Sequence, residues 1–109
     1  MSLYGQYIAE RENKSIIETD KGFVTFYPMN GGLYLEDIYV IPEERHSREA
    51  SKLADQVAEI ALEKGLTKLY GSVVPSANNS TASLRVLLGY GFKLDSCTNN
   101  FILFRKELA

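Results

Sequence analysis

The period of the hydrophobic pattern changes near residue 47. Before that point, β-branched and aromatic residues fill three short runs that turn-forming residues separate, which is typical of antiparallel strands. The runs cover residues 15–19, 22–29 and 33–41, with turns at Asp20-Lys21-Gly22 and Met29-Asn30-Gly31-Gly32. Apolar residues at helical spacing before the first run predict a short helix over residues 3–13.

From about Ser47 onward, apolar residues recur every three or four positions, which predicts a helix of about five turns. Gly65 then supplies a left-handed C-cap. The next apolar run, 68–74, predicts a strand that is parallel to the strand at 33–41 or splayed from it, because a helix connects the two. A second helix is predicted at 82–88, and two closing strands at 92–95 and 101–106.

These elements predict a single α/β (α+β) domain over residues 1–109, a three-layer αβα sandwich with a mixed, mostly antiparallel sheet. A length of 109 residues and a hydrophobic fraction of 45% suit one domain with a real core. No apolar run approaches the ~20 residues that span a bilayer, and no secretory leader pattern opens the chain. We therefore expect a cytoplasmic protein without a membrane partner.

Composition argues against several classes of function. The formal charge of -2 and the isoelectric point near 5.4 lack the basic footprint of a nucleic-acid binder, although a local basic patch stays an alternative. The single cysteine, Cys97, excludes an intramolecular disulfide, and the single histidine leaves few options for zinc. We therefore expect no nucleic-acid partner, no metal site and a reducing compartment.

Two arginines, Arg45 and Arg48, stand between the third strand and the long helix. A helix N-terminus presents backbone N–H groups that lack intrahelical partners, together with the positive end of the helix dipole. Both features favour an anion, so this junction predicts a site for a phosphate-bearing ligand. The alternative interpretation is a solvated basic turn.

The same junction carries the first of two patterns that resemble a known family. It reads Leu35-x-x-Ile38-x-Val40-x-Pro42-x-x-Arg45 and continues as Arg45-x-x-Arg48-x-Ala50. The continuation resembles the Arg/Gln-x-x-Gly-x-Gly/Ala phosphate loop of the GNAT superfamily of acetyl-coenzyme A-dependent N-acetyltransferases, and it matches that loop at its first and last positions.

The second pattern, Ser83-x-Arg85-Val86-Leu87-x-x-x-Gly91-Phe92, resembles the second helix of that family and the start of the strand behind it. Residues 22–108 have family counterparts for nearly every element. The N-terminal helical region is shortened, so the proportions are similar to those of small phage-encoded members.

The resemblance implies that acetyl-coenzyme A is the co-substrate and that its pyrophosphate binds at the start of the long helix. The residues that inherit this role are Arg45, Ser47, Arg48, Glu49, Ala50 and Ser51. A glycine is usual where Arg48 stands, and often where His46 stands. Because a helical first turn has negative φ, we expect position 48 to need no glycine, Arg48 to reach a phosphate and Glu49 to point away from it.

The resemblance further implies that the main chain of the strand before the loop pairs with the pantetheine arm and polarises the thioester carbonyl. The residues concerned are Ile38, Tyr39 and Val40. It also assigns Asn79 and Ser83 to the cofactor. Counting back from Gly91-Phe92 reaches Ser80 instead, and an Asx turn or a helix cap is the alternative for Asn79.

For catalysis, the resemblance implies a general base on or near the cofactor-binding strand. Glu36 and Asp37 are the available carboxylates, and strand alternation puts them on opposite faces, so at most one faces the cleft; we favour Glu36. The family's usual acid is a tyrosine of the second helix, but Leu87 occupies that position. Tyr90 is the substitute candidate, with packing beside Phe92 as its alternative.

We therefore expect an acyltransferase that moves an acetyl group directly from acetyl-coenzyme A to an amine of a small molecule or peptide. Leu87, Arg48 and His46 favour the alternative of a catalytically weak or inactive member that binds acyl-coenzyme A or another protein. A different acyl group or a non-amine acceptor is a second alternative. Exposed sheet edges also suggest a homodimer.

Overall fold

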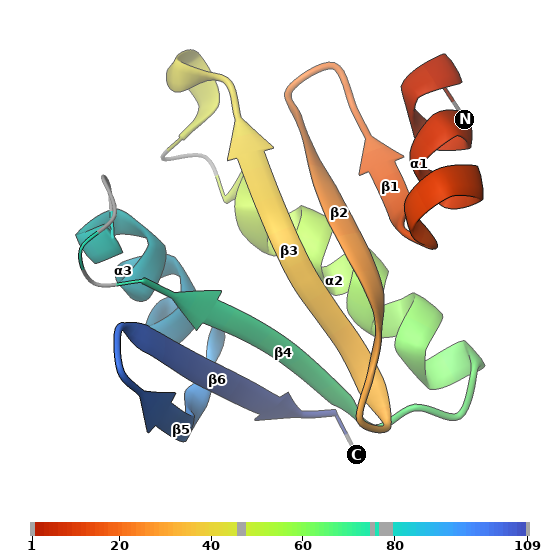
Figure 1. Ribbon diagram of the computed structural model, residues 1–109. Coiled ribbons are helices and arrows are strands. Elements are labelled where there is room, and N and C mark those ends of the chain that lie inside the picture. Colours follow the sequence, from red (N-terminus) through yellow and green to blue (C-terminus); the bar gives the residue numbers. More distant parts are fainter. Residues whose placement is uncertain (1, 46–47, 75, 77–79, 109) are drawn as a thin grey trace.

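The computed structural model describes residues 2–45, 48–74, 76 and 80–108, and of residues 80–83 it describes the backbone alone. Figure 1 shows a twisted sheet with α-helices on its flanks. The elements are α1 (Leu3–Glu12), β1 (Ser15–Glu18), β2 (Gly22–Met29), β3 (Gly32–Val40), the 3-10 turn η1 (Pro42–Glu44), α2 (Glu49–Glu63), β4 (Lys68–Val73), α3 (Ser80–Tyr90), β5 (Lys93–Thr98) and β6 (Phe101–Glu107).

The strand order is β1-β2-β3-β4-β6-β5, and β3–β4 is the parallel pair in an otherwise antiparallel sheet. Helix α2 connects β3 to β4 and lies behind β2 and β3, while α1 lies beside the edge strand β1 (Figure 1). The predicted antiparallel meander and the mixed, mostly antiparallel sheet flanked by helices are confirmed. The predicted second helix is longer than expected, because the helix continues through Gly89 and ends before Gly91, whose φ is 100°.

Strands β3 and β4 pair over a short stretch. Their partners are Gly32 with Lys68, Leu33 with Leu69 and Tyr34 with Tyr70. Beyond these pairs the strands diverge toward their C-terminal ends (Figure 1). The sequence predicted a parallel strand or a splayed one, and the structure combines both. We call the divergent stretches, 35–40 of β3 and 71–73 of β4, the splay.

A β-bulge interrupts β3 at Glu36. Phe26 of β2 pairs with Leu35 and Thr25 pairs with Asp37, so Glu36 is the extra residue. Thr25 lies between two core residues of β2 and therefore faces the other side of the sheet, as does its partner Asp37.

The bulge corrects the expectation that Glu36 and Asp37 lie on opposite faces. Leu35 and Ile38, three residues apart, both face α2 and α3, and the two carboxylates between them share the opposite face. We call that opposite side, turned away from α2 and α3, the distal face. Strict alternation fails here because the extra residue shifts the phase of the strand.

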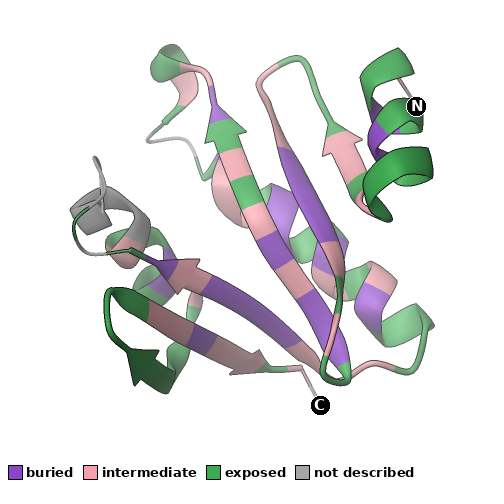
Figure 2. Ribbon diagram, in the orientation of Figure 1, coloured by how far each residue is buried: buried purple, intermediate pink, exposed green. Residues whose placement is uncertain are grey.

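The main core lies between the sheet and α2. Figure 2 shows the buried residues along β2, β3, β4 and the inner side of α2, whereas β5 is exposed throughout. The largest fully buried side chains of this core are Val24, Leu33, Leu53, Val57 and Leu69. The helix ends as predicted: Gly65 has φ 76°, and the N–H groups of Gly65 and Leu66 donate to Leu62 and Ala61 in a Schellman cap.

The described residues lack two features that would indicate a membrane span or a metal centre. No helix among them combines the length and apolar character that crossing a bilayer requires. The same residues contain no cluster of three or more His, Cys, Asp or Glu side chains placed to hold a metal ion.

The closed end of the β3–β4 pair has no room for a side chain at Gly32, since an added Cβ would lie 2.3 Å from the Lys68 carbonyl oxygen. We predict that Gly32→Ala lowers the free energy of unfolding by about 3 kcal/mol, because a backbone atom must move. Urea denaturation measures this. The control Gly89→Ala, where nothing lies within 4 Å, should raise stability by up to ~1 kcal/mol. Equal effects of the two variants would contradict the tight β3–β4 contact.

Candidate active site

The first turn of α2 presents backbone N–H groups. The first hydrogen bond within the helix runs from the Lys52 N–H to the Arg48 carbonyl oxygen, at 3.0 Å. The N–H groups of Glu49, Ala50 and Ser51 therefore have no carbonyl partner within the helix. Arg48, the N-cap residue, makes no side-chain hydrogen bond to them. Together with the helix dipole, these amides form a site for an anion.

Arg48 adopts a left-handed conformation, with φ 68° and ψ 17°. The expectation of a negative φ at this position is therefore wrong. Arg48 is the N-cap residue that precedes α2, so it does not have the dihedral angles of the first helical turn. A non-glycine residue in this region costs roughly 1 kcal/mol. The glycine that the resemblance leads one to expect here was the signal for this conformation. His46 and Ser47 lie outside the described residues, so the prediction for Ser47 stays untested.

Arg45 is tied back to the end of β3. Its Nε donates to the Val40 carbonyl oxygen at 3.0 Å, and its guanidinium carbon lies 5.7 Å from the centre of the Tyr39 ring. The hydrogen bond uses Nε and leaves the two Nη groups outside the contact, and a guanidinium can bind a phosphate through such groups. These contacts therefore hold the positively charged guanidinium of Arg45 at the C-terminal end of β3, on the way to α2.

Glu49 is buried at the start of α2, with 7% of its surface exposed. A carboxylate at this position interacts favourably with the helix dipole but lowers the positive potential that an external anion would meet. The structure thus keeps this side chain out of solvent. That it points away from a bound phosphate stays a prediction.

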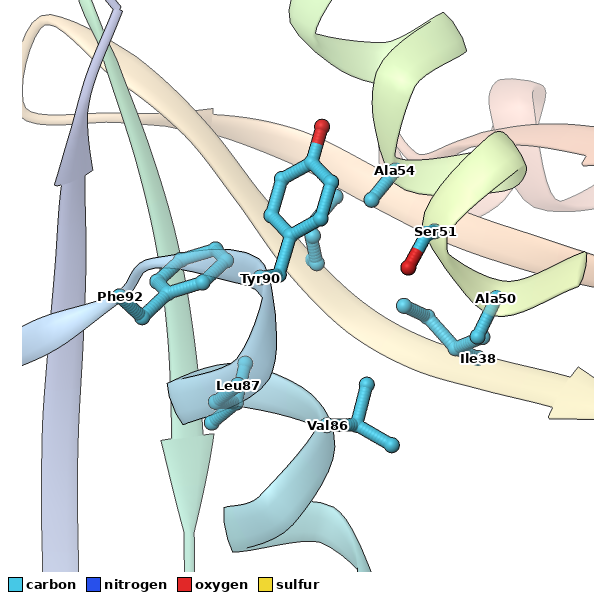
Figure 3. A pocket seen from close by; sticks show the side chains of 9 residues that line it. Ile38, Ala50, Ser51, Ala54, Val86, Leu87, Tyr90 and Phe92 are labelled. Carbon is cyan, nitrogen blue, oxygen red and sulfur yellow. The ribbon is translucent and has the colours of Figure 1, made fainter. Parts of the chain in front are cut away.

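An apolar pocket continues from the first turn of α2 (Figure 3). Its walls are Leu35 and Ile38 of β3, Ala50, Ser51 and Ala54 of α2, Val86, Leu87 and Tyr90 of α3, and Phe92. In Figure 3 the Ser51 hydroxyl points toward the pocket, and Val86 faces it from the opposite wall. Ala50 and Ser51 belong both to this pocket and to the turn whose amides lack a partner within the helix, so an apolar surface adjoins the anion site.

Main-chain groups along the splay add an extended edge to this site. Ile38, Tyr39 and Val40 pair with β2 on one side, but their β4 side lies beyond the last β3–β4 pair. Successive residues of a strand direct their N–H and C=O groups to alternate edges, so part of this main chain is turned toward the splay. The Val40 carbonyl is already bound by Arg45.

Leu87 occupies a packing position. It is buried, and a Cβ added to Gly71 of β4 would lie 2.8 Å from its Cδ2 atom. Leu87, at the position where the resemblance expects a tyrosine, therefore packs α3 against β4. A leucine cannot donate a proton, so the position supplies no general acid.

Tyr90 packs beside Phe92, with ring centres 6.0 Å apart, as the alternative interpretation expected. Its hydroxyl donates to Asp55 Oδ1 at 2.5 Å. Burial of the ring, and then the hydrogen bond and charge of Asp55, raise the pKa of Tyr90 well above its ordinary value. The Lys106 ammonium lies 4.7 Å from the ring centre and donates to the Tyr90 carbonyl. Tyr90 is thus a weak proton donor whose proton is already engaged.

Glu36 lies on the distal face and is paired with Lys14. The Lys14 Nζ is 2.9 Å from Glu36 Oε1 and 3.6 Å from Glu12 Oε2, and it lies 6.0 Å from the centre of the Tyr27 ring. The hydrogen bond from Lys14 to Glu36 is the main cause that raises the pKa of Lys14. Sequence reasoning missed Lys14, since no spacing rule links the end of a helix to a bulge 22 residues later.

Asp37 is the more exposed of the two candidate bases. Its side chain faces solvent, while its backbone N–H donates to Thr25 Oγ1 at 3.1 Å. The structure thus brings Glu36 and Asp37 together on one face and separates them from the apolar pocket. Asn79 lies outside the described residues, and Ser83 lies on α3 without a described side chain, so both assignments stay untested.

A sequence model of the family described as "Acetyltransferase (GNAT) family" matches residues 4–90. The chain belongs to the GNAT family of acetyltransferases. Membership confirms the resemblance that the two sequence patterns indicated. It agrees with the fold, a mixed six-stranded sheet with three α-helices that is similar to a solved acetyltransferase of the GNAT family from Desulfovibrio desulfuricans, with a TM-score of 0.78 at 20% identity over 88% of this chain and 70% of that one.

Two curated relatives match a short part of this GNAT chain. Thialysine N-epsilon-acetyltransferase of Bos taurus is 54% identical over 37 residues, which is 34% of this chain and 22% of the relative. The Sus scrofa enzyme of the same name is 53% identical over 36 residues. The chain thus spans about a fifth of the length of these relatives.

Two solved structures of acetyltransferases match nearly the whole chain. The PaiA N-acetyltransferase from Thermoplasma acidophilum, in complex with coenzyme A, has a TM-score of 0.75 at 18% identity, covering 96% of this chain and 69% of that one. An aminoglycoside 6′-N-acetyltransferase complexed with coenzyme A has a TM-score of 0.75 at 14% identity, covering 94% and 77%. At such low identity, these likenesses establish the fold alone.

The left-handed conformation of Arg48 leads us to predict that glycine is more stabilising than alanine at this position, the reverse of the usual order in a helix. We expect Arg48→Gly to be more stable than Arg48→Ala by about 1 kcal/mol, because glycine adopts positive φ without steric strain. At the helical position Lys52 the order should reverse, with Lys52→Ala more stable than Lys52→Gly by about 1 kcal/mol. Chemical denaturation of the four variants measures both differences. The same order at both positions would contradict the left-handed turn.

Proposed function

We propose that the protein is an N-acetyltransferase that moves an acetyl group directly from acetyl-coenzyme A to an amine. The observation that carries this proposal is the juxtaposition at the start of α2. Amides of the first helical turn that have no partner within the helix adjoin the apolar pocket on one side and the splayed strand β3 on the other. An elongated cofactor with a pyrophosphate, a flexible arm and a thioester fits that sequence of surfaces.

In this proposal the pyrophosphate accepts hydrogen bonds from the N–H groups of Glu49, Ala50 and Ser51. Arg45 and Arg48 supply positive charge, each contribution being on the order of 1 kcal/mol when exposed. Ser47 completes the loop. Binding by main-chain groups is compatible with the substitution of Arg48 for glycine, since Arg48 already adopts the conformation that glycine favours.

The pantetheine arm would lie along the splay. Main-chain groups of Ile38, Tyr39 and Val40 would pair with its amides, with Asn79 and Ser83 as further contacts. A backbone N–H in this stretch would bind the thioester carbonyl. In other acyl-transfer enzymes an oxyanion donor of that kind contributes roughly 3 to 4 kcal/mol.

Transfer requires a neutral amine. Glu36 or Asp37 takes the proton from the incoming ammonium, directly or through water, and the distal face presents both carboxylates. The amine nitrogen then forms a bond to the acetyl carbon, the carbon–sulfur bond breaks, and coenzyme A leaves as a thiolate, while the nitrogen gives up a second proton to water or to that thiolate. Because a thiol has a pKa of about 8.5, it is a tolerable leaving group near neutral pH without a strong acid. Leu87 and Tyr90 are consistent with such an acid-free departure.

The acceptor in this proposal is an amine of a small molecule or a peptide. A cytoplasmic location, a relation to small phage-encoded members and a homodimer that covers the exposed strand β5 belong to the same proposal. Nucleic acid is not part of it, because the chain carries a formal charge of -2.

The second candidate function is a GNAT module that binds acyl-coenzyme A but transfers slowly or not at all. Two observations favour it: Leu87 packs where a proton donor is expected, and Lys14 engages the carboxylate of Glu36. Calorimetric titration with acetyl-coenzyme A, followed by thiol release across a panel of amines, separates the two candidates. Binding with release supports the transferase, binding without release supports the module, and no binding at millimolar ligand would rule out both.

The position of Arg45 makes a prediction about affinity. We expect Arg45→Ala to weaken acetyl-coenzyme A binding roughly tenfold, because a charge-assisted contact to phosphate is lost. Arg105→Ala removes the same charge from β6, where Arg105 pairs with Asp95 and Glu107, and should leave the affinity unchanged. Calorimetry on both variants tests this. Equal affinities of Arg45→Ala and the unaltered protein would mean that the phosphate site lies elsewhere.

The hydrogen bond between Tyr90 and Asp55 makes a prediction about rate. Tyr90→Phe should keep thiol release within about threefold while lowering stability by ~1 kcal/mol, since the hydroxyl serves Asp55. The free energy of unfolding of the unaltered protein should also fall as pH rises above ~10. In that range a tyrosine of the unfolded chain loses its proton, whereas Tyr90 in the folded protein keeps its own because its pKa is raised. Tyr90→Phe should lose that part of the pH dependence. A rate loss of ~10²-fold or more would instead make Tyr90 the general acid.

A further inference from the structure

A side-chain contact crosses the splay on the distal face. The hydroxyl of Tyr34 in β3 is hydrogen-bonded to the Ser72 Oγ atom in β4. Tyr34 belongs to the last residue pair of the parallel stretch, where its partner is Tyr70, and Ser72 stands two residues further along β4, in the diverging part. The contact therefore joins the two strands just beyond the point where their main-chain pairing stops.

The Tyr34 ring is held in place on its other side. Tyr27 of β2 is its cross-strand partner, and the two ring centres lie 5.1 Å apart at a tilt of 58°. A tilted aromatic pair at this separation contributes stability beyond the burial of its rings, which favours this position of the Tyr34 ring. Because the Tyr34 ring is held against β2 and its hydroxyl is hydrogen-bonded to Ser72 of β4, the contact limits how far β4 can move away from β3.

The contact also lies at the opposite end of β3 from the anion site. Val40, where the strand ends before the turn into α2, lies six positions after Tyr34, so this part of β3 is at most roughly 20 Å long at ~3.3 Å per residue. A cofactor whose pyrophosphate binds at α2 and whose arm follows β3 brings its acyl end toward Tyr34. The Tyr34–Ser72 contact therefore closes the splay beyond Ile38 to Val40, the stretch that would bind the arm and its thioester.

This inference rests on the proposed acetyl-coenzyme A site. We propose that Tyr34 and Ser72 form a clamp, by which we mean the hydrogen bond that joins β3 to β4 across the splay. The clamp fixes the angle between β3 and β4 before the cofactor arrives and so preorganises the splay for the arm. Tyr34 is a positioning residue: it acts through the separation of the strands and takes no proton. Without the clamp, binding of the arm must also order the two strands, which lowers affinity.

A double-mutant cycle on cofactor affinity tests the clamp. We expect Tyr34→Phe and Ser72→Ala each to weaken acetyl-coenzyme A binding about fivefold in calorimetry, and the double variant to be no weaker than either, because both remove one interaction. Ser72→Thr keeps a hydroxyl and should retain affinity within about twofold. This rescue distinguishes the hydrogen bond from general damage to the strand.

Tyr70→Phe is the matched control. The Tyr70 hydroxyl donates to the Asn30 carbonyl oxygen at 3.0 Å, so this variant also loses one tyrosine hydrogen bond on the distal face, but at the closed end of the strand pair. We expect it to bind acetyl-coenzyme A like the unaltered protein. Unchanged affinity of Tyr34→Phe, additive losses in the double variant, or an equal loss in Tyr70→Phe would each overturn the clamp while leaving the proposed function intact. Absence of binding by the unaltered protein would overturn both.

Discussion

The structure depends on how briefly β3 and β4 pair. Three residue pairs join them, and Gly32 lets the first pair approach more closely than a Cβ would allow. Because α2 must connect two parallel strands, it crosses the sheet, and it begins after the η1 turn that follows β3. The amides of its first turn therefore sit beside the diverging strands. A binding site for an anion and an extended edge for an arm thus result from one constraint on strand pairing.

The bulge at Glu36 divides the two faces of β3 between packing and chemistry. It turns Leu35 and Ile38 together toward α2 and α3, where they line the apolar pocket. It also leaves Glu36 and Asp37 together on the distal face, where a proton acceptor for an amine would be needed. A regular strand would have placed one carboxylate among apolar side chains, at a substantial desolvation cost.

The sequence was sufficient to predict the three α-helices and the six strands, the C-cap at Gly65 and the parallel or splayed partner of β3, but not the 3-10 turn η1. These features follow from local periodicity, turn chemistry and the length of the crossover. The bulge could not be predicted, because it depends on the register between β2 and β3 and not on either strand alone. The conformation of Arg48 was also missed, since a bulky residue in a left-handed turn contradicts its local preference.

Side-chain partnerships were the least predictable part of the candidate site. Lys14 meets Glu36, and Tyr90 meets Asp55, only after the sheet and helices have assembled. Neither pair has a spacing signal, because the members come from different elements. Both pairs change the roles that the sequence suggested, as they engage groups that the family resemblance would assign to proton transfer.

The most direct test of the cofactor site is an NMR titration of the amide-labelled protein with acetyl-coenzyme A. The site described here predicts that the largest amide shifts occur at Glu49, Ala50 and Ser51 and along Ile38 to Val40, with little change in β5. Saturable shifts confined to other surfaces would contradict the assignment of the α2 N-terminus and the splay as the place where the cofactor binds.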